Sequence, residues 1–174
     1  TTISSVSGGS IVNAFLATRL NPWPTAAMDR QFDRFANDLR ELTRRNIRLI
    51  PSFRWVERAY RKHIGELCLA DLPSEGPNFV FCATDMANGV NWTFGRDLVD
   101  RAEPGRWEAG SYRAGFAGAG QVPLVRAVAA SSAFPPIIGP VSVPIDANAY
   151  EPVEIPGDRP RKRGIAKDLR LTDG

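Results

Sequence analysis

The chain has 174 residues, of which 43% are hydrophobic, so it can bury one sizeable core without disulfides or a bound metal for stability. Its 22 basic and 19 acidic side chains are spread along the sequence and leave a formal net charge of only +3, which does not indicate a nucleic-acid-binding protein. The cysteines form no C-x-x-C pair, and no apolar run reaches the ~20 residues that span a bilayer, so we expect reduced thiols and no membrane anchor within the sequence.

Both ends of the sequence indicate a piece of a longer domain. Residues 1–6 already resemble a buried strand, and the sequence stops directly after Asp173-Gly174. We therefore expect one domain over residues 1–174, truncated at both ends, with any targeting signal lying upstream. The expected location is the cytoplasm or the periphery of a membrane.

The first predicted elements are a strand, a sharp turn and a helix. Residues 1–6 are mostly small or β-branched, which is typical of a strand that enters a tight turn. The turn is Ser7-Gly8-Gly9, and apolar residues then recur at helical spacing over residues 10–20. Asn21-Pro22 ends this helix, because proline cannot continue it.

Two more helices are predicted, from about residue 29 to 45 and from 52 to 69. The first has one apolar stripe opposite a face of mixed charges. We interpret this stripe as packing on the core rather than as a lid or a membrane-seeking face. The second helix carries the only histidine, His63, beside Arg61 and Lys62.

The middle of the chain changes to strands. Residues 78–84 form a short apolar run that predicts a strand, and Asn88-Gly89 predicts a turn into a second strand at 90–94. This pattern indicates a β-hairpin. Residues 101–120 are rich in glycine and arginine and are predicted to form a loop.

The last part of the chain is predicted to contain one helix and one strand. Pro123 suits the first residue of a helix that runs through Ser131, and Pro135-Pro136 then stops it. Residues 139–164 contain several prolines and are left unassigned. Residues 169–172 predict a closing strand directly before Asp173.

Helices that separate short apolar strands predict an α/β layered domain. In such domains, binding and catalytic sites gather at the carboxyl ends of the strands. Ser7 and Asp173 both lie at such ends. They are therefore the first candidates for a functional site.

The serine turn has the features of a nucleophile. A serine between small residues at a strand-to-helix turn exposes its hydroxyl, as attack on a carbonyl requires. Gly8 leaves a backbone N–H free to face a developing oxyanion, and Gly9 is expected to let helix and strand approach closely. Two other interpretations stay open: an ordinary helix start with Ser7 as its N-cap, and a phosphate-binding turn, although the lysine of such turns is missing.

The nucleophile needs a base, for which the chain offers one histidine and several carboxylates. His63 precedes every candidate acid, whereas the histidine of an α/β-hydrolase triad comes last, so we interpret it as a surface or structural residue. Asp173 is the best-placed carboxylate, because it follows an apolar strand and precedes Gly174. Asp85 and Asp146 compete with it, but Asp85 is better interpreted as a turn former.

Four segments occur in the order seen in patatin-like phospholipases: SSVSGGS, NFVFCATDMANG, AVAASSAFPPI and LRLTDG. The chain resembles this family along essentially its whole length. Ser5 replaces the glycine that usually opens the elbow motif G-x-S-x-G. The resemblance implies a three-layer α/β/α fold related to the cytosolic phospholipase A2 catalytic domain.

The resemblance also implies a Ser-Asp dyad that hydrolyses lipid esters. Ser7 would attack the ester carbonyl and form an acyl-enzyme, while Asp173 would take its proton and later activate the hydrolytic water. Gly8 and Gly9 would form the elbow backbone. The family's glycine-rich oxyanion loop precedes the serine strand and lies outside these residues, so the segment alone is expected to lack most oxyanion donors and can be inactive. No cofactor and no metal ion are expected.

The expected partners are a lipid ester as substrate and the surface of a membrane, with no nucleic acid. A basic cluster can bind anionic headgroups but is more simply a solvated loop. This cluster consists of Arg159, Arg161, Lys162 and Arg163.

Large aromatic side chains either line an acyl channel or, as is commoner for aromatic residues, belong to the core. The candidates are Trp23, Phe53, Trp92, Trp107 and Phe134. A different class of function also stays open, namely a non-catalytic lipid- or protein-binding module that keeps the fold.

Overall fold

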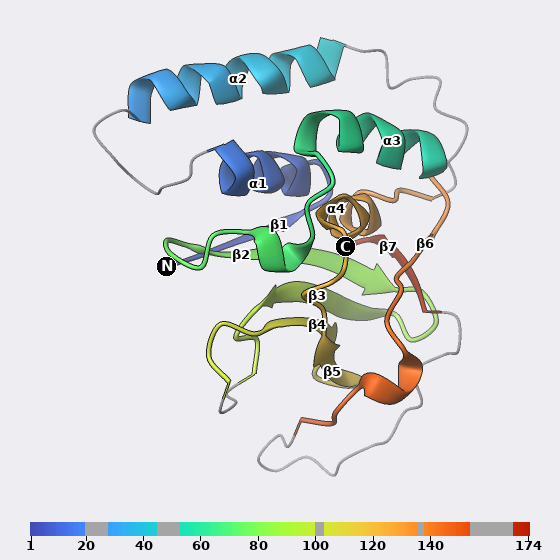
Figure 1. Cartoon of the computed structure of the whole chain (residues 1–174). Helices are drawn as coiled ribbons and strands as arrows, with labels where there is room; N and C mark the ends of the chain where they lie inside the picture. Colours follow the sequence, from blue (N-terminus) through green and yellow to red (C-terminus); the bar gives the residue numbers. More distant parts are fainter. Residues whose placement is uncertain (20–27, 45–52, 100–102, 136–137, 154–168) are drawn as a thin grey trace.

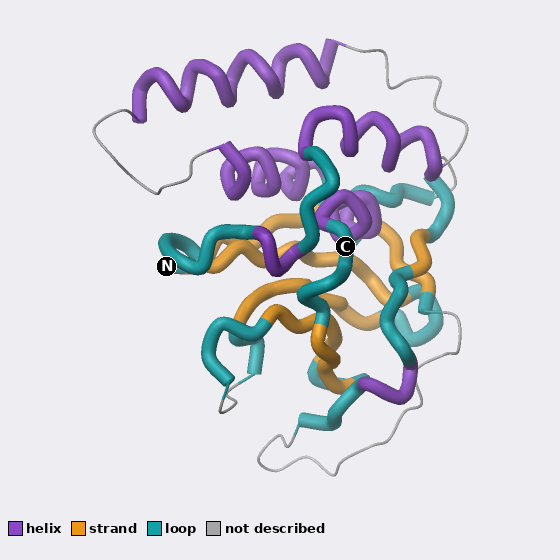
Figure 2. Tube along the Cα trace, in the orientation of Figure 1, coloured by secondary structure: helices purple, strands orange, loops and turns teal. Residues whose placement is uncertain are grey.

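The computed structural model describes residues 1–19, 28–44, 53–99, 103–135, 138–153 and 169–174. Its helices lie on one side and its strands on the other, so the described part of the chain has two layers (Figures 1 and 2). The prediction of an α/β fold is confirmed. A second helical layer is not present among the described residues.

One curled sheet of seven strands forms the lower layer, and most of its strand pairs are antiparallel. The strand order is β5-β4-β3-β2-β7-β6, and β1 pairs with β2 in addition. The strands are β1 (Thr2–Val6), β2 (Asn78–Asp85), β3 (Val90–Arg96), β4 (Trp107–Ser111), β5 (Gly115–Gly118), β6 (Val141–Ser142) and β7 (Arg170–Asp173).

Two strands share the edge of β2 that faces away from β3. Strand β1 runs parallel to β2 and its last pair joins Val6 to Cys82. Strand β7 runs antiparallel to β2 and its last pair joins Asp173 to Ala83. Because Cys82 and Ala83 are consecutive, β1 and β7 run toward each other and their carboxyl ends meet. This arrangement brings the end of β1 and the C-terminal residues of the chain together.

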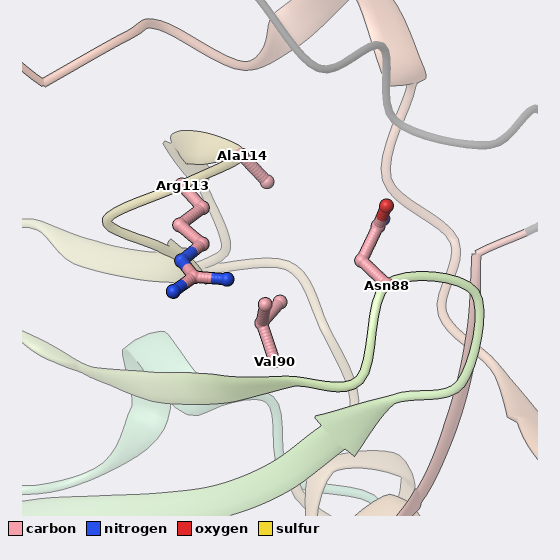
Figure 3. A pocket seen from close by; sticks show the side chains of 4 residues that line it. All are labelled: Asn88, Val90, Arg113 and Ala114. Carbon is pink, nitrogen blue, oxygen red and sulfur yellow. The ribbon is translucent and has the colours of Figure 1, made fainter. Parts of the chain in front are cut away.

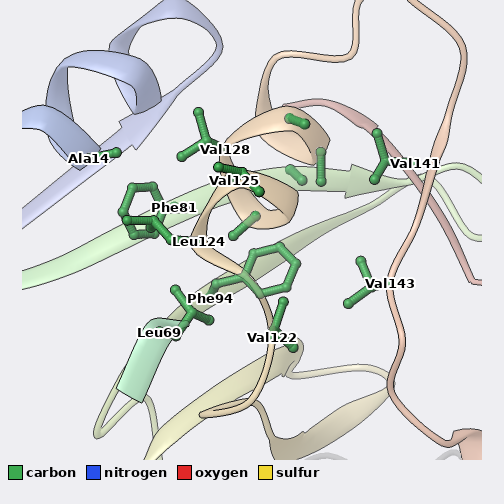
Figure 4. Close-up of a cluster of buried hydrophobic side chains, with 14 of the residues drawn as sticks. Ala14, Leu69, Phe81, Phe94, Val122, Leu124, Val125, Val128, Val141 and Val143 are labelled. Atoms are coloured by element: carbon green, nitrogen blue, oxygen red, sulfur yellow. The ribbon is translucent and has the colours of Figure 1, made fainter. Parts of the chain in front are cut away.

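The helical layer contains α1 (Gly8–Arg19), α2 (Met28–Arg44), α3 (Phe53–Ile64) and α4 (Leu124–Ser131). Helix α4 packs against β2, β7, α1 and α3, and is buried over most of its length. The core lies between this layer and the sheet, where Phe81 and Phe94 meet Leu124 and Val128 (Figure 4). Short 3-10 turns form η2 (Leu69–Asp71) and η3 (Ala147–Ala149).

Most of the predicted elements are confirmed. The initial strand, turn and helix, the β2–β3 hairpin, the α4 helix and the closing strand are all present. Helix α2 packs on α1 with Phe35 buried, as its apolar stripe predicts. The helix predicted to reach residue 69 instead ends at Ile64, directly before Gly65, a residue that commonly ends helices. Within residues 139–164, which were left unassigned, the structure places β6 and η3, and residues 154–168 lie outside the described ranges.

The prediction of a loop over residues 101–120 is wrong, because β4 and β5 form an antiparallel pair there. The glycines that favoured a loop are required for close packing between these strands. A Cβ atom at Gly110 would lie 2.1 Å from the carbonyl oxygen of Gly115. Glycine in a strand can mark such a close backbone approach as readily as a break.

Candidate active site

Ser7 occupies the connection between β1 and α1 in a conformation that non-glycine residues rarely adopt. Its φ is 55°, and among the described residues only Asp97 is another non-glycine with positive φ. A strained backbone of this kind costs of order 1–3 kcal/mol and must be held by its surroundings. The backbone N–H of Ser7 donates to the carbonyl oxygen of Ser131 at 3.0 Å and lies 3.2 Å from its Oγ.

The Ser7 hydroxyl donates a hydrogen bond of 2.7 Å to Oδ2 of Asp173, across 166 positions of sequence. Both side chains are half-buried. The contact follows from the meeting of β1 and β7 on β2, since each residue lies at the carboxyl end of its strand. The backbone N–H of Asp173 donates to the carbonyl oxygen of Ala133 at 3.0 Å. A carboxylate at this distance is within reach of the hydroxyl proton, as a general base must be.

Gly174 is required by the crowding where the two strands meet. A Cβ atom at this position would lie 2.7 Å from Cγ2 of Val6 and 3.2 Å from the carbonyl oxygen of Cys82. Both neighbours belong to the pair that ends β1. A residue without a side chain therefore allows Asp173 to lie directly beside the serine turn.

The glycines after Ser7 differ from the expectation. A Cβ at Gly8 would meet nothing within 4 Å, so a side chain at this position would enter open space. At Gly9 a Cβ would meet only the Cβ of Ser5 at 3.8 Å, which is ordinary contact, so the expected close approach of helix and strand is not present there. Because α1 begins at Gly8, these amides lie at the positive end of the helix. Their role as oxyanion donors stays a prediction.

A buried network of polar side chains lies beneath the turn. Asn13 Nδ2 donates to Ser5 Oγ at 2.8 Å, and Ser5 Oγ lies 3.0 Å from Ser10 Oγ. Ser10 Oγ in turn lies 2.7 Å from Ser131 Oγ. Ser5, noted in the sequence only as a small replacement for glycine, is thus a hydrogen-bonding residue.

Sequence reasoning missed Ser10, Asn13 and Ser131. The available signal was two polar residues, Ser10 and Asn13, on the face of α1 that is buried. Buried polar groups in proteins almost always have partners, so a polar pair at i and i+3 on an apolar face indicates a network. The partner on α4, however, cannot be read from the helix pattern.

The competing bases are engaged elsewhere. The half-buried ring of His63 lies 6.3 Å from that of Phe15, at the end of α3, which agrees with its interpretation as a surface or structural residue. Asp85 accepts from the backbone N–H of Ala87 at 2.9 Å and from Asn88 Nδ2 at 2.6 Å, so it is a turn former as predicted. Asp146 caps η3 by accepting from the N–H of Asn148.

The aromatic candidates for an acyl channel separate into two groups. Trp92 and Trp107 are buried in the core. Phe134 is 58% exposed and follows Ala133, whose carbonyl oxygen holds Asp173. Trp23, the side chain of Phe53 and the basic cluster of residues 159–163 lie outside the described part of the chain.

Two surface hollows of the described residues lie away from Ser7 and Asp173. The turns at the ends of two hairpins enclose a small hollow, and a wider concavity of about 350 Å³ adjoins it over β3, β4 and β5. The small hollow is lined by Asn88, Val90, Arg113 and Ala114 (Figure 3). Neither hollow includes a nucleophile paired with a base, so hydrogen-bond geometry rather than concavity identifies the candidate site.

The described residues offer neither a membrane-spanning helix nor a metal-binding cluster. Within those ranges no helix combines the length and the apolar character needed to cross a bilayer. No group of three or more histidine, cysteine, aspartate or glutamate residues is arranged there to hold a metal ion. Cys68 and Cys82 are both free thiols.

Comparison with known proteins shows the family to which the chain belongs. The family model described as patatin-like phospholipase matches residues 1–174, the whole chain. No curated protein matches the sequence.

Proposed function

Because the chain belongs to the patatin-like phospholipase family, we propose that it is a serine acyl hydrolase that cleaves carboxylic ester bonds of phospholipids or related lipids. The observation that carries the proposal is the 2.7 Å hydrogen bond from Ser7 Oγ to Asp173 Oδ2. Ser7 is the proposed nucleophile and Asp173 the proposed base. Family membership supports the lipid substrate, and the geometry of the pair supports the chemistry.

In the first step, Ser7 Oγ bonds to the carbonyl carbon of the ester as its proton passes to Asp173. The carbonyl oxygen becomes an oxyanion, which the backbone N–H at Gly8 and the positive end of α1 help to stabilise. When this intermediate collapses, the bond to the alcohol breaks and the alcohol oxygen takes the proton from Asp173. The acyl group stays on Ser7.

In the second step, Asp173 takes a proton from water as the water oxygen bonds to the acyl carbon. The bond to Ser7 Oγ then breaks and Ser7 recovers its proton, which releases the fatty acid. One carboxylate therefore serves both half-reactions, so the proposal requires no histidine. This agrees with the position of His63 beside Phe15.

Apolar side chains beside the dyad support a lipid substrate. Val6, 42% exposed, directly precedes Ser7, and Phe134, 58% exposed, directly follows Ala133. Exposed apolar residues that gather at a site commonly mark contact with an apolar ligand or a membrane. We propose that an acyl chain lies along this rim and that the enzyme approaches membrane surfaces with it.

The family's three-layer fold is also part of the proposal. Among the described residues, helices cover only one face of the sheet. The other face carries Cys82, Thr84 and Thr93, which are half-buried. A further helical layer over this face would complete the α/β/α arrangement.

The test is labelling of the full-length protein with a fluorophosphonate probe, followed by mass spectrometry to locate the modified residue. We expect labelling at Ser7 that is abolished in Ser7→Ala and strongly reduced in Asp173→Asn. Folded protein that is not labelled at Ser7 contradicts the hydrolase. Retained binding to lipid vesicles in that case would favour a non-catalytic binding module.

A further inference from the structure

We propose that Ser131 is a positioning residue that holds the nucleophile Ser7 in its strained conformation. The inference rests on the proposed function and concerns a residue outside the dyad. Ser131 ends α4 and is completely buried. It binds the only N–H group of Ser7 with both its carbonyl oxygen and its hydroxyl.

The hydrogen-bonding capacity of the Ser131 hydroxyl is fully used. A serine hydroxyl has one donor and two acceptor sites. Ser131 donates to the carbonyl oxygen of Cys82, lies 2.7 Å from Ser10 Oγ and accepts from the N–H of Ser7. With the donor directed at Cys82, the two acceptor sites serve Ser7 and Ser10. A hydroxyl with three fixed partners cannot rotate without breaking bonds in a buried site, which is costly.

The three partners belong to the elements that create the turn. Ser7 follows β1, Ser10 lies in the first turn of α1, and Cys82 is the β2 residue at which β1 ends. Ser131 therefore joins the nucleophile itself, the helix after it and the strand beside it. These are the contacts needed to hold a positive φ at a non-glycine residue.

The same end of α4 also holds the base. The carbonyl oxygen of Ala133 accepts from the backbone N–H of Asp173 at 3.0 Å and from Thr172 Oγ1 at 2.6 Å. Ser131 and Ala133 thus bind one member of the pair each. Their separation depends on one short segment, so a shift of that segment changes the approach of nucleophile and base.

Ser132 supplies a matched control. It is adjacent to Ser131 and also buried, but its Oγ donates to the carbonyl oxygen of Val128 at 2.8 Å and lies 3.2 Å from the Tyr60 hydroxyl. None of its side-chain hydrogen bonds reaches the serine turn. Removing the hydroxyl of Ser131 or that of Ser132 therefore costs a buried hydrogen bond, but only the Ser131 hydroxyl contacts Ser7.

The experiment compares Ser131→Ala, Ser132→Ala and Ser131→Thr in the full-length protein, with a short-chain carboxylic ester as substrate. Misplacing a reacting group by about 1 Å can lower a rate by about 100-fold, so we expect Ser131→Ala to lower kcat by about 10- to 100-fold. KM should stay within about twofold, because the substrate contacts are unchanged. Ser132→Ala should stay within about twofold in kcat, and Ser131→Thr, which restores a hydroxyl, should recover part of the loss.

The outcomes separate the two proposals. If the unmodified protein is not labelled by fluorophosphonate at Ser7, the hydrolase itself fails. If it is labelled but Ser131→Ala keeps the kcat of the unmodified protein, or loses no more than Ser132→Ala, the positioning role fails. Should Ser131→Ala not fold, Ser10→Ala removes one partner of the same hydroxyl. A selective, smaller fall in kcat is then expected, and an unchanged kcat overturns the inference.

Discussion

Two aspartates lie at opposite ends of one short ladder of strand pairs, and they have different hydrogen-bond partners. Asp173 pairs with Ala83 and Asp85 pairs with Leu171. Asp85 is 2% exposed, and its oxygens accept from Ala87 and Asn88 of the following turn. Asp173 is half-buried and accepts from the Ser7 hydroxyl. An acid at a strand end is thus the proposed base at Asp173 and a turn former at Asp85, according to the segment that meets it.

The difference between the two aspartates arises from strand direction. At Asp85, β2 turns back into β3, so the nearest donors are the amides of that hairpin turn. At Asp173, β7 meets the end of β1, so the donor is the hydroxyl of Ser7, which lies between β1 and α1. Both residues end a strand. Only the neighbouring segment of the same chain decides which donors each carboxylate meets.

The largest expected effect is that of Asp173→Asn on activity. The amide is close in shape to the carboxylate but cannot accept the Ser7 proton, so kcat/KM for a lipid ester should fall by about 1,000-fold or more. Steady-state hydrolysis measures this loss, and circular dichroism checks that the fold is kept. A variant that retains a tenth of the activity would show that Asp173 is not the base.

Asp85→Ala should give the opposite pattern. It removes the acceptor of two hydrogen bonds, from the N–H of Ala87 and from the Asn88 amide, which costs about 1–3 kcal/mol in the free energy of unfolding. Urea unfolding measures the loss. Activity per folded molecule should stay within about twofold, and a large fall in kcat without loss of stability would remove the distinction between the two aspartates.

Gly174→Ala tests the crowding where β1 and β7 meet. The added methyl group would lie 2.7 Å from Val6 Cγ2, so either Val6 must rotate or the two strand ends must separate. Over-packing of this kind costs about 1 kcal/mol or more, and we expect kcat to fall about fivefold. The control is Gly8→Ala, where the structure offers open space for a Cβ. Urea unfolding of both variants separates the effect of crowding from that of a glycine-to-alanine change in general. Equal free energies of unfolding for the two variants would contradict the crowding at Gly174.

The smallest effect concerns Tyr150, which packs edge-on against Trp92 near the buried Asp85. Burial, and secondly the negative charge of Asp85, raise the pKa of the Tyr150 hydroxyl above its ordinary value of about 10. The unfolded chain therefore loses this proton at a lower pH than the folded protein does. Stability is unaffected by this group below pH 10 and falls as the pH rises above about 10.

Tyr150→Phe should make that alkaline loss of stability smaller, by up to about 1.4 kcal/mol for each pH unit above 10. At pH 7 the change in the free energy of unfolding should stay below about 1 kcal/mol, because the buried hydroxyl has no hydrogen-bond partner in the described structure. Urea unfolding at pH 7, 10 and 11 tests this. Burial also raises the pKa of Tyr60, so part of the alkaline loss remains in both proteins. Identical pH dependence of the two proteins would refute the assignment.

The local elements were predictable because their signals lie within a few residues. Apolar spacing identified α1 and α2, and Asn88-Gly89 identified the β2–β3 hairpin. The prediction of a loop over the glycine-rich residues 101–120 was wrong, because glycine allows close strand packing as well as a loop. Gly110 either breaks a strand or lets a neighbouring strand approach closely. The sequence alone does not specify that β5 is this neighbour.

The sequence by itself determined the strand-turn-helix around Ser7, the strand before Asp173 and the family, because these depend on local pattern and composition. Only the tertiary structure decided that β1 and β7 end against consecutive residues of β2, and that Ser131 holds the turn. Contacts between residues so far apart follow from register and packing, which local spacing does not encode. The candidates were therefore visible in the sequence, and their 2.7 Å contact was a property of the fold.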